Sequence, residues 1–409
     1  MIPLSALFSG TALLLLGSGL LGTLLGVRGS IEGYGDQSLG LIMSAYFFGF
    51  LLGTFLAPAA IRRMGHIRAF SFFGALFACT VLLHAIWVHP FVWGLLRFCT
   101  GLAVVGLYTV IESWLNGTVD GSQRGRVFAV YMAINLSALA LGQQLLRLAA
   151  PESFALFSVV AMLVCAAMLP VLATRLAQPV MLSADRIGVR QIFRIAPAAA
   201  AGALFSGLTI GAFWGLGPVY AGRLGLGIDQ VAIFMTTTII GGALLQWPVG
   251  RLSDSGDRRR TLAIACAGAA LAAGFAMLLS GSAGFAIYAV FFLYGGLSFA
   301  VYPVAVAHLL DHVAPADLLP ACSTVLLLHG LGAVLGPALA GFAMGRFGAP
   351  AFPGFLALAH LAIAAYVLAR LLIRRRTIHG EAHFHPMLRT SPAAMEMLPE
   401  AEAALEDSD

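Results

Sequence analysis

Twelve apolar segments follow one another along this chain of 409 residues, and each is long enough to cross a lipid bilayer as a helix. A hydrocarbon core of roughly 30 Å requires about 20 apolar residues in helical form. Only helices and closed barrels satisfy every backbone polar group inside lipid. The sequence therefore predicts an all-α polytopic membrane protein with short loops. The expected spans are residues 4–27, 38–61, 68–89, 91–114, 126–148, 154–175, 197–219, 229–250, 261–280, 283–309, 319–344 and 350–373.

The composition excludes a large soluble domain. Hydrophobic residues make up 60% of the chain and charged residues only 10%, whereas a soluble domain carries about 25% charged residues. The net charge of +5 does not indicate a nucleic-acid partner, because the arginines lie in short loops between apolar spans. The five cysteines form neither a CxxC pair nor a metal-ligand spacing, so we expect no metal and no cofactor.

The arginines of the loops predict the orientation of the chain, because cytoplasmic loops carry an excess of basic residues. Loops after even-numbered spans hold Arg62, Arg63, Arg68, Arg124, Arg126, Arg186, Arg190, Arg194, Arg251, Arg258, Arg259 and Arg260. Loops on the other side hold only Arg28, Arg147, Arg223 and Arg346. We therefore expect a multi-pass protein of the bacterial inner membrane with both termini in the cytoplasm.

The two halves of the chain resemble each other in sequence. The stretch GDQSLGLIMSAYFFG, which begins at Gly35, parallels GIDQVAIFMTTTIIG, which begins at Gly227. The stretch Phe98–Val110 parallels Phe292–Val304 in the same order along the chain. A repeat of membrane helices is typical of transporters that work by alternating access, with a site at the midplane between the halves.

This repeat divides the chain into four parts. We expect a six-helix bundle over residues 1–175, a cytoplasmic loop over 176–196 and a second six-helix bundle over 197–376. Residues 377–409 are acidic and contain no apolar run long enough to span a membrane, so the sequence predicts a disordered cytoplasmic tail.

Several motifs resemble those of the major facilitator superfamily, and in particular its YcaD-like branch. The loop GRLSDSGDRRR at Gly250–Arg260 resembles the loop motif of the superfamily, although its first-half copy has Ala60 or Ile61 where an acid is expected. The resemblance implies two pseudo-symmetric six-helix halves and a transport function, but no particular cargo. The branch resemblance rests on VIESWL (Val110–Leu115), QRGRVFAVYM (Gln123–Met132), QWPVGRLSD (Gln246–Asp254) and VYPVAVA (Val301–Ala307).

Arg97 is the leading candidate for a substrate contact. It lies in the outer half of the fourth span, where an arginine at the centre of a span costs about 2.5–3.5 kcal/mol on insertion scales. Its repeat equivalent is Phe291, so the halves differ at this point. In one interpretation Arg97 faces a cavity and binds an anion or a protonatable group. In the other its guanidinium reaches the outer interface by snorkelling.

Other polar and aromatic side chains are expected near the midplane, where each either contacts substrate or forms an interhelical hydrogen bond. His329 can also titrate near neutral pH. The candidate cavity residues besides Arg97 are Tyr108, Asn135, Gln143, Trp214, Gln246, Tyr294, Tyr302 and His329.

A second group of charged residues is expected to close the inner gate. Glu112 is either a proton-coupling carboxylate or one partner of a salt bridge to arginines that emerge near it, and we expect Asp254 to form a matching latch. The predicted gating residues are Arg62, Arg63, Glu112, Arg124, Arg126, Asp254, Arg258 and Arg259.

The function that the sequence favours is secondary transport of a small organic solute, coupled to an ion that we expect to be the proton. Efflux of apolar or amphipathic compounds is the alternative. A GxxxxGK[ST] loop is absent from the sequence, so direct use of ATP is not expected. An intramembrane enzyme would need a cluster of catalytic groups, and a sensor or scaffold remains the remote alternative. A monomer is sufficient for this architecture.

Overall fold

The computed structural model describes residues 2–119, 123–174, 187–280, 284–314, 317–373, 383–387 and 391–398. The first half contains α1 (Ile2–Ile31), α2 (Asp36–Met64), α3 (His66–Ile86), α4 (Pro90–Thr118), α5 (Arg124–Gln144), the 3-10 turn η2 (Leu145–Leu148) and α6 (Phe154–Ala173). The second half contains α7 (Val189–Ile195), α8 (Pro197–Arg223), α9 (Ile228–Asp254), α10 (Arg258–Leu279), α11 (Ala286–Ser298), α12 (Val301–Leu310), α13 (Leu318–Phe347), α14 (Ala351–Ile373) and η4 (Pro392–Met397).

All twelve predicted spans are confirmed as helices long and apolar enough to cross a membrane. The chain is therefore a multi-pass membrane protein. One span differs from a plain helix: the tenth consists of α11 and α12, which are separated at Phe299 and Ala300. The short helix α7 falls inside the stretch 176–196 expected to be a connecting loop, and residues 176–186 of that stretch lie outside the described residues.

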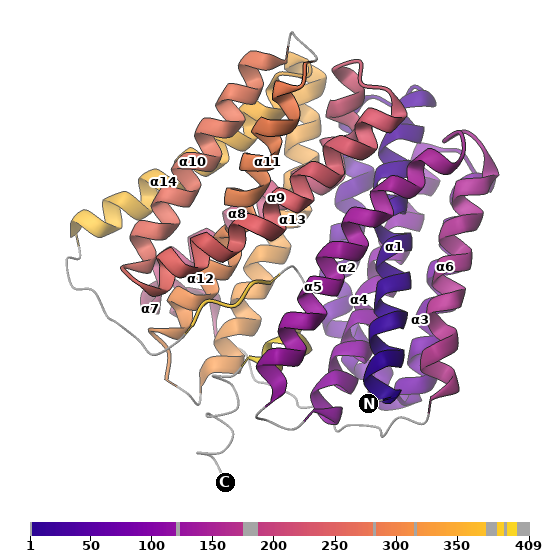
Figure 1. The fold of residues 1–409 in the computed structure, drawn as a ribbon, viewed down its shortest axis with the longest axis horizontal. Coiled ribbons are helices and arrows are strands. Elements are labelled where there is room, and N and C mark those ends of the chain that lie inside the picture. The colour runs from indigo at the N-terminus through magenta and orange to yellow at the C-terminus, as the bar shows by residue number, and fades with distance from the viewer. Residues whose placement is uncertain are drawn as a thin grey trace.

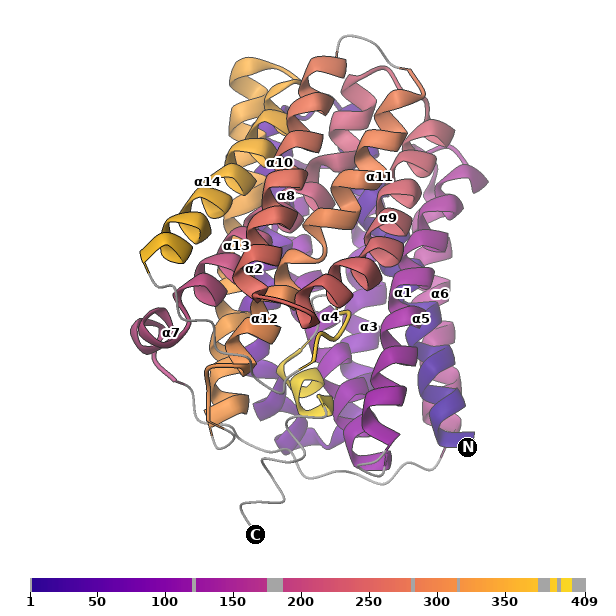
Figure 2. The ribbon, with the colours of Figure 1, turned by 60° about the vertical axis from the view of Figure 1, so that its left-hand side comes forward.

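The spans form two bundles that stand side by side, α1 to α6 and α8 to α14 (Figures 1 and 2). The internal repeat appears in the packing. In the first bundle a methyl group added at Gly101 would overlap the carbonyl oxygen of Tyr46, where α4 crosses α2. In the second bundle Gly295 meets the carbonyl oxygen of Thr238 in the same way, where α11 crosses α9. Small residues at such crossings let helix backbones approach closely in lipid.

We call the end of the molecule at which α1 begins the proximal end, and the end at which α1 finishes the distal end. The bundles join in the distal half. Ser44 Oγ donates to the carbonyl oxygen of Val334 at 2.6 Å and accepts from the backbone N–H of Ala338 at 3.0 Å. Gly40 lies so close to the carbonyl oxygen of Pro337 that a methyl group would overlap it. The helix α2 thus seals against α13 on the distal side of the molecule.

Two ion pairs add to this distal closure. Arg223 Nη2 lies 2.8 Å from Asp36 Oδ1, and Arg147 Nε lies 2.9 Å from Asp229 Oδ1. Each pair joins one bundle to the other. Asp36 and Asp229 belong to the two repeated stretches that begin at Gly35 and Gly227. Both arginines are among the four that the sequence assigns to the sparsely charged side of the protein.

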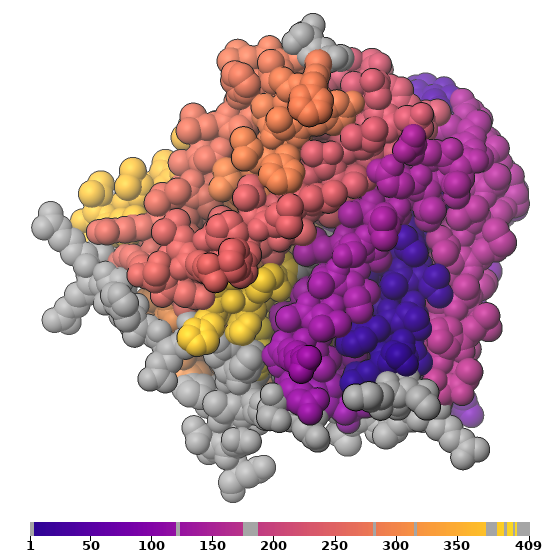
Figure 3. All heavy atoms as spheres, viewed as in Figure 1, coloured from indigo at the N-terminus to yellow at the C-terminus, as the bar shows by residue number. Residues whose placement is uncertain are grey.

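The proximal half is arranged differently, because the C-terminal segment lies between the bundles there. Residues 383–387 and η4 fill a hollow bounded by both bundles (Figure 3). Phe384, Met387, Met395 and Leu398 are buried. Residues 383–387 and 391–398 of the tail that the sequence predicts to be disordered therefore pack against the bundles through apolar side chains. The acidic residues from Glu400 onward lie outside the described residues.

Candidate functional site

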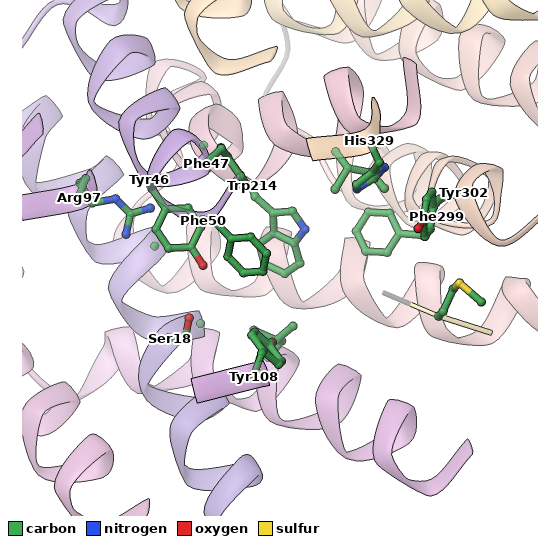
Figure 4. A pocket seen from close by; sticks show the side chains of 16 residues that line it. Ser18, Tyr46, Phe47, Phe50, Arg97, Tyr108, Trp214, Phe299, Tyr302 and His329 are labelled. Atoms are coloured by element: carbon green, nitrogen blue, oxygen red, sulfur yellow. The ribbon is translucent and has the colours of Figure 1, made fainter. Parts of the chain in front are cut away.

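A cavity with a volume of about 120 Å³ lies between the two bundles (Figure 4). Its walls come from helices of both halves, as expected for a site at the interface of a repeat. The residues that line it are Ser18, Gly19, Gly22, Tyr46, Phe47, Phe50, Arg97, Tyr108, Leu139, Ile210, Trp214, Gly215, Phe299, Tyr302, His329 and Met387.

Arg97 supplies the cationic wall of this cavity. Its guanidinium carbon lies 4.2 Å from the centre of the Tyr46 ring, and its side chain is buried. Figure 4 shows the side chain pointing toward Tyr46. A cation over an aromatic face gains about 0.5–2 kcal/mol, depending on how well water is excluded. Arg97 thus lies inside the protein over an aromatic ring, and not at an exposed interface. This placement agrees with the interpretation in which Arg97 faces a cavity.

Aromatic rings continue this wall in the first bundle. The ring of Phe50 lies 6.3 Å from that of Tyr46 and 6.2 Å from that of Tyr108. The Tyr108 hydroxyl donates to Asn135 Oδ1 at 3.4 Å. The wall from Arg97 to Tyr108 therefore combines one positive charge with a flat apolar surface.

The opposite wall comes from the second bundle. The rings of Trp214 and Phe299 lie 6.3 Å apart, and those of Tyr302 and His329 lie 4.5 Å apart. Among the described residues the buried hydroxyl of Tyr302 has no hydrogen-bond partner. A buried hydroxyl without a partner is costly, so a polar group of a ligand in this cavity would gain by bonding to it.

Five predicted cavity residues line this space, namely Arg97, Tyr108, Trp214, Tyr302 and His329. Four others lie outside it. Gln143 joins α5 to α1, because its Nε2 donates to the carbonyl oxygen of Gly19 at 3.1 Å and its Oε1 accepts from the hydroxyl of Thr23. Asn135 donates to the carbonyl oxygen of Tyr131 at 2.7 Å and reaches the cavity only through Tyr108.

The other two residues pack within the second bundle. The ring of Tyr294 lies 5.6 Å from that of His360 and therefore faces α14. Gln246 in α9 is fully buried, and its side-chain amide has no hydrogen-bond partner among the described residues. Neither residue lines the described cavity. Polarity within a span thus marks interhelical contacts as often as it marks the cavity.

Sequence reasoning missed the apolar part of the cavity. Tyr46, Phe47 and Phe50 lie on α2; Tyr46 and Phe47 belong to the stretch from Gly35 that the repeat analysis singled out, and Phe50 comes directly after its end. Their spacing along α2 was the available signal, since Tyr46 and Phe50 are one helical turn apart. Met387 had no such signal, because it belongs to a segment expected to be disordered.

The ion pairs that the described structure gives for the predicted gating residues lie within the second bundle. Glu112 is fully buried, and its partners are the Tyr131 hydroxyl at 2.8 Å, the Ser391 backbone N–H at 3.0 Å and the Ser391 hydroxyl. These contacts replace the expected arginine. Among the described residues no ion pair involves Arg62, Arg63, Arg124 or Arg126.

The charges of the second loop motif pair within their own bundle. Arg258 Nη1 lies 2.9 Å from Asp254 Oδ1, and its Nε lies 2.6 Å from Asp311 Oδ2. Burial raises the pKa of Asp311 even though Arg258 acts in the opposite direction. Arg259 pairs with Asp257 at 2.8 Å. The geometry is that of a rigid corner between α9, α10 and α12, with Asp254 placed at the edge of the proximal opening.

No group of three or more histidine, cysteine or acidic residues in the described part of the chain is arranged to hold a metal ion. The cavity instead offers a guanidinium, aromatic faces, a phenol hydroxyl and an imidazole. These groups can bind an organic anion and hydrogen-bond to it. They include no nucleophile activated by an adjacent base, which covalent catalysis requires.

Comparison with known proteins agrees with this geometry. The model of the family described as Major Facilitator Superfamily matches residues 7–321 and, in a second match, residues 199–386. An uncharacterized MFS-type transporter, YcaD, of Escherichia fergusonii is 28% identical over 386 residues, which cover 93% of this chain and 98% of that protein. YcaD of Escherichia coli strain 536 is 28% identical over 347 residues, which cover 84% and 90% respectively.

Solved structures match the fold over most of its length. The nucleoside transporter NupG aligns with a TM-score of 0.73 at 15% identity, covering 90% of this chain and 99% of that one. A bacterial homologue of the human lysosomal transporter Spinster, in an inward-facing and occupied conformation, aligns with a TM-score of 0.72 at 14% identity. That alignment covers 94% of this chain and 98% of the other. At such low identities these likenesses concern the fold alone.

Proposed function

The chain belongs to the major facilitator superfamily, whose members are transporters and not enzymes, and we propose that it carries a small aromatic organic anion by alternating access. The observation that supports this proposal is the placement of Arg97 over Tyr46 in the wall of the central cavity. An anionic group on the solute would pair with the guanidinium. Its ring would lie between the aromatic walls, and a polar group at its far end would reach Tyr302 or His329.

Alternating access needs one end to be closed while the other is open. The distal end is closed by Ser44, Gly40 and the pair Asp36–Arg223. We propose that the proximal end faces the cytoplasm of a bacterial inner membrane, because most loop arginines lie there. In this orientation both termini are cytoplasmic and the conformation is inward-facing. We propose that the transporter is a monomer, because the two halves of one chain suffice to form a cavity between them.

We also propose that the coupling ion is the proton. Glu112 lies one turn from Tyr108 toward the proximal end, so a buried carboxylate sits directly beneath the cavity. His329 in the cavity wall is a second titratable group. In liposomes that contain a pH-sensitive dye, addition of a solute that binds should move protons with it. A solute flux with no accompanying proton flux would remove this part of the proposal.

The experiment that tests the substrate class is thermal stabilisation of the purified protein by a panel of solutes. A ligand that binds only the folded state raises the melting temperature with its concentration. Aromatic carboxylates should stabilise the wild type, and Arg97→Ala should weaken their binding by about tenfold or more, as expected for a hydrogen bond to a charged group.

Arg251→Ala is the matched control for this experiment. The Arg251 guanidinium lies 3.6 Å from the centre of the Trp247 ring, so it makes the same kind of contact as Arg97, but beside an exposed tryptophan and away from the cavity. Binding should be unchanged in this variant. Equal binding of the aromatic carboxylates by the wild type and Arg97→Ala would contradict the proposed anion site.

Efflux of apolar compounds is the second candidate function, and the aromatic lining of the cavity favours it. Trp214, Phe47 and Phe299 give the walls a large apolar surface. In that case uncharged amphipathic compounds should stabilise the protein, and Arg97→Ala should bind them as well as the wild type does. The same panel therefore distinguishes the two functions.

A further inference from the structure

The proximal mouth between the bundles holds a segment of the same chain. The turn η4 contacts α4 and α5 of the first bundle and α13 of the second. In the proximal half, where the helices of the two bundles diverge, the C-terminal segment provides contacts that reach both of them (Figure 3). We propose that this mouth is a peptide-binding surface whose ligand is the C-terminal segment, residues 383–387 and 391–398, and that their binding closes the central cavity from the proximal side.

The contact with the first bundle centres on Glu112. One carboxylate oxygen of Glu112 accepts from both the backbone N–H and the hydroxyl of Ser391. Two residues further along, the carbonyl oxygen of Ala393 accepts from Asn116 Nδ2 at 2.6 Å. Polar groups of α4 thus recognise the backbone of the segment, and they do so one helical turn apart.

The contact with the second bundle centres on Phe384. Its backbone N–H donates to Asp254 Oδ1 at 2.9 Å. Its ring packs so closely on Gly250 that a methyl group there would overlap the ring. The ring also joins an apolar cluster that contains Val301 and Val304 of α12. Gly250 and Asp254 are the glycine and the acid of the loop motif at the end of α9. This motif therefore contacts the C-terminal segment in the second bundle.

Two residues of the C-terminal segment also reach cavities. Met387 lines the central cavity, and Pro392 lines a smaller cavity between α2 and α13. Met395, Met397 and Leu398 are buried as well. A solute that leaves the central cavity by the proximal mouth would meet these side chains. The segment therefore acts as a tethered plug, which must leave before solute exchanges and before the bundles can approach each other at this end.

The plug is tested by access to the cavity, a measurement that requires no substrate and is independent of the proposed cargo. The full-length protein, with its five cysteines replaced, carries one reporter, Ser18→Cys, in the cavity wall. With Phe384→Ala and Ser391→Ala together, labelling of the reporter by a hydrophilic maleimide should be about tenfold faster, because the open population rises with each lost contact. Pro386→Ala, an exposed position of the same segment, is the control and should leave the rate unchanged.

A cross-link tests the position of the segment directly. Pro392 and Ser323 line the same small cavity, so the pair Pro392→Cys and Ser323→Cys should form a disulfide with a mild oxidant. Pro392→Cys with Glu152→Cys, an exposed residue at the distal end, should not. Unchanged labelling in the Phe384/Ser391 variant, or failure of the first pair to cross-link, would overturn the plug.

Discussion

Arg223 at the end of α8 lies with its Nη2 2.8 Å from Oδ1 of Asp36 at the start of α2, and so joins the two bundles at the distal end. The carboxylate is largely buried, whereas the guanidinium is 46% exposed. Such a half-exposed pair contributes at most about 1 kcal/mol. The pair Arg147–Asp229 also joins the two bundles at the distal end, here with the arginine in the first bundle and the acid in the second. Together they bias the molecule toward the distally closed conformation.

Loss of these two ion pairs should open the distal end in steps. Asp36→Asn should raise the open population by less than about tenfold, and Asp36→Asn with Asp229→Asn should raise it further. Spin labels at Glu152 and Phe347, one exposed position on each bundle at this end, would report the separation by pulsed electron resonance. The swap Asp36→Arg with Arg223→Asp should restore the wild-type distances. The same distances in the wild type and the double variant would show that these pairs do not hold the end closed.

Gly40 and Gly101 should respond differently to the same substitution. A methyl group at Gly101 would overlap the Tyr46 carbonyl within one bundle, so Gly101→Ala should lower the stability of the fold by about 1–3 kcal/mol. A methyl group at Gly40 would overlap the Pro337 carbonyl across the bundles, so Gly40→Ala should mainly favour the distally open state. Gly94, with no atom near its added methyl, is the control. Melting curves measure the loss of stability, and the same spin labels measure the opening of the distal end. A melting temperature of Gly101→Ala equal to that of Gly94→Ala would contradict the predicted loss of stability.

Gln143 should prove to be a structural residue and not a substrate contact. Gln143→Leu removes the bonds to Gly19 and Thr23 and should lower stability by about 0.6–2 kcal/mol, the usual range for polar contacts between membrane helices. The relative binding of different solutes should be unchanged. A changed order of preference among solutes in Gln143→Leu would place this residue in the recognition site after all.

Asp257 caps the start of α10 and should make part of the stability depend on pH. Its carboxylate accepts from the Arg259 backbone N–H at 2.9 Å. Burial alone would raise the pKa of Asp257, but the hydrogen bonds and charge of Arg259 outweigh burial and lower it. Since the folded pKa lies below the unfolded value of about 4, this stabilisation is complete above that value. It is lost as the pH falls through the folded pKa.

Asp257→Ala should therefore lower the free energy of unfolding by about 1 kcal/mol at neutral pH. The difference from wild type should shrink in melting curves recorded below about pH 4. Asp257→Asn keeps a capping oxygen, so its free energy of unfolding should fall by less than that of Asp257→Ala. A difference that stays constant down to about pH 3 would rule out an ionised cap, because the wild-type carboxyl would then stabilise α10 equally well when protonated.

The fold could be predicted from the sequence because its cause is local. A span needs only an uninterrupted apolar run, and the repeat places Gly101 and Gly295 at equivalent helix crossings. The break in the tenth span was less evident, since the run from Ala286 to Leu310 stays apolar throughout. Pro303 was its signal, because proline has no N–H to donate within the helix.

The candidate site was only partly predictable, because polarity marks a residue without giving the direction of its side chain. Arg97 and Gln143 look equally polar in the sequence, yet one lines the cavity and the other joins two helices. Glu112 was expected beside arginines, but its partners are Tyr131 and Ser391. The partner Ser391 lies 279 residues away, in the C-terminal segment.

The break between α11 and α12 separates the shape of the cavity wall from the insertion of the span into the bilayer, which a straight helix would couple. Phe299 and Tyr302 lie at the break and line the cavity, whereas exposed side chains such as Leu293 lie outside it, on the outer face of α11. Because Pro303 leaves the Phe299 carbonyl without its helical donor, this short stretch can bend while both ends of the span stay in place. Changes at residues 299–302 can therefore alter which molecules fit, while insertion into the bilayer depends on other residues. Evolution can retune the cargo of such a protein through one turn of one helix.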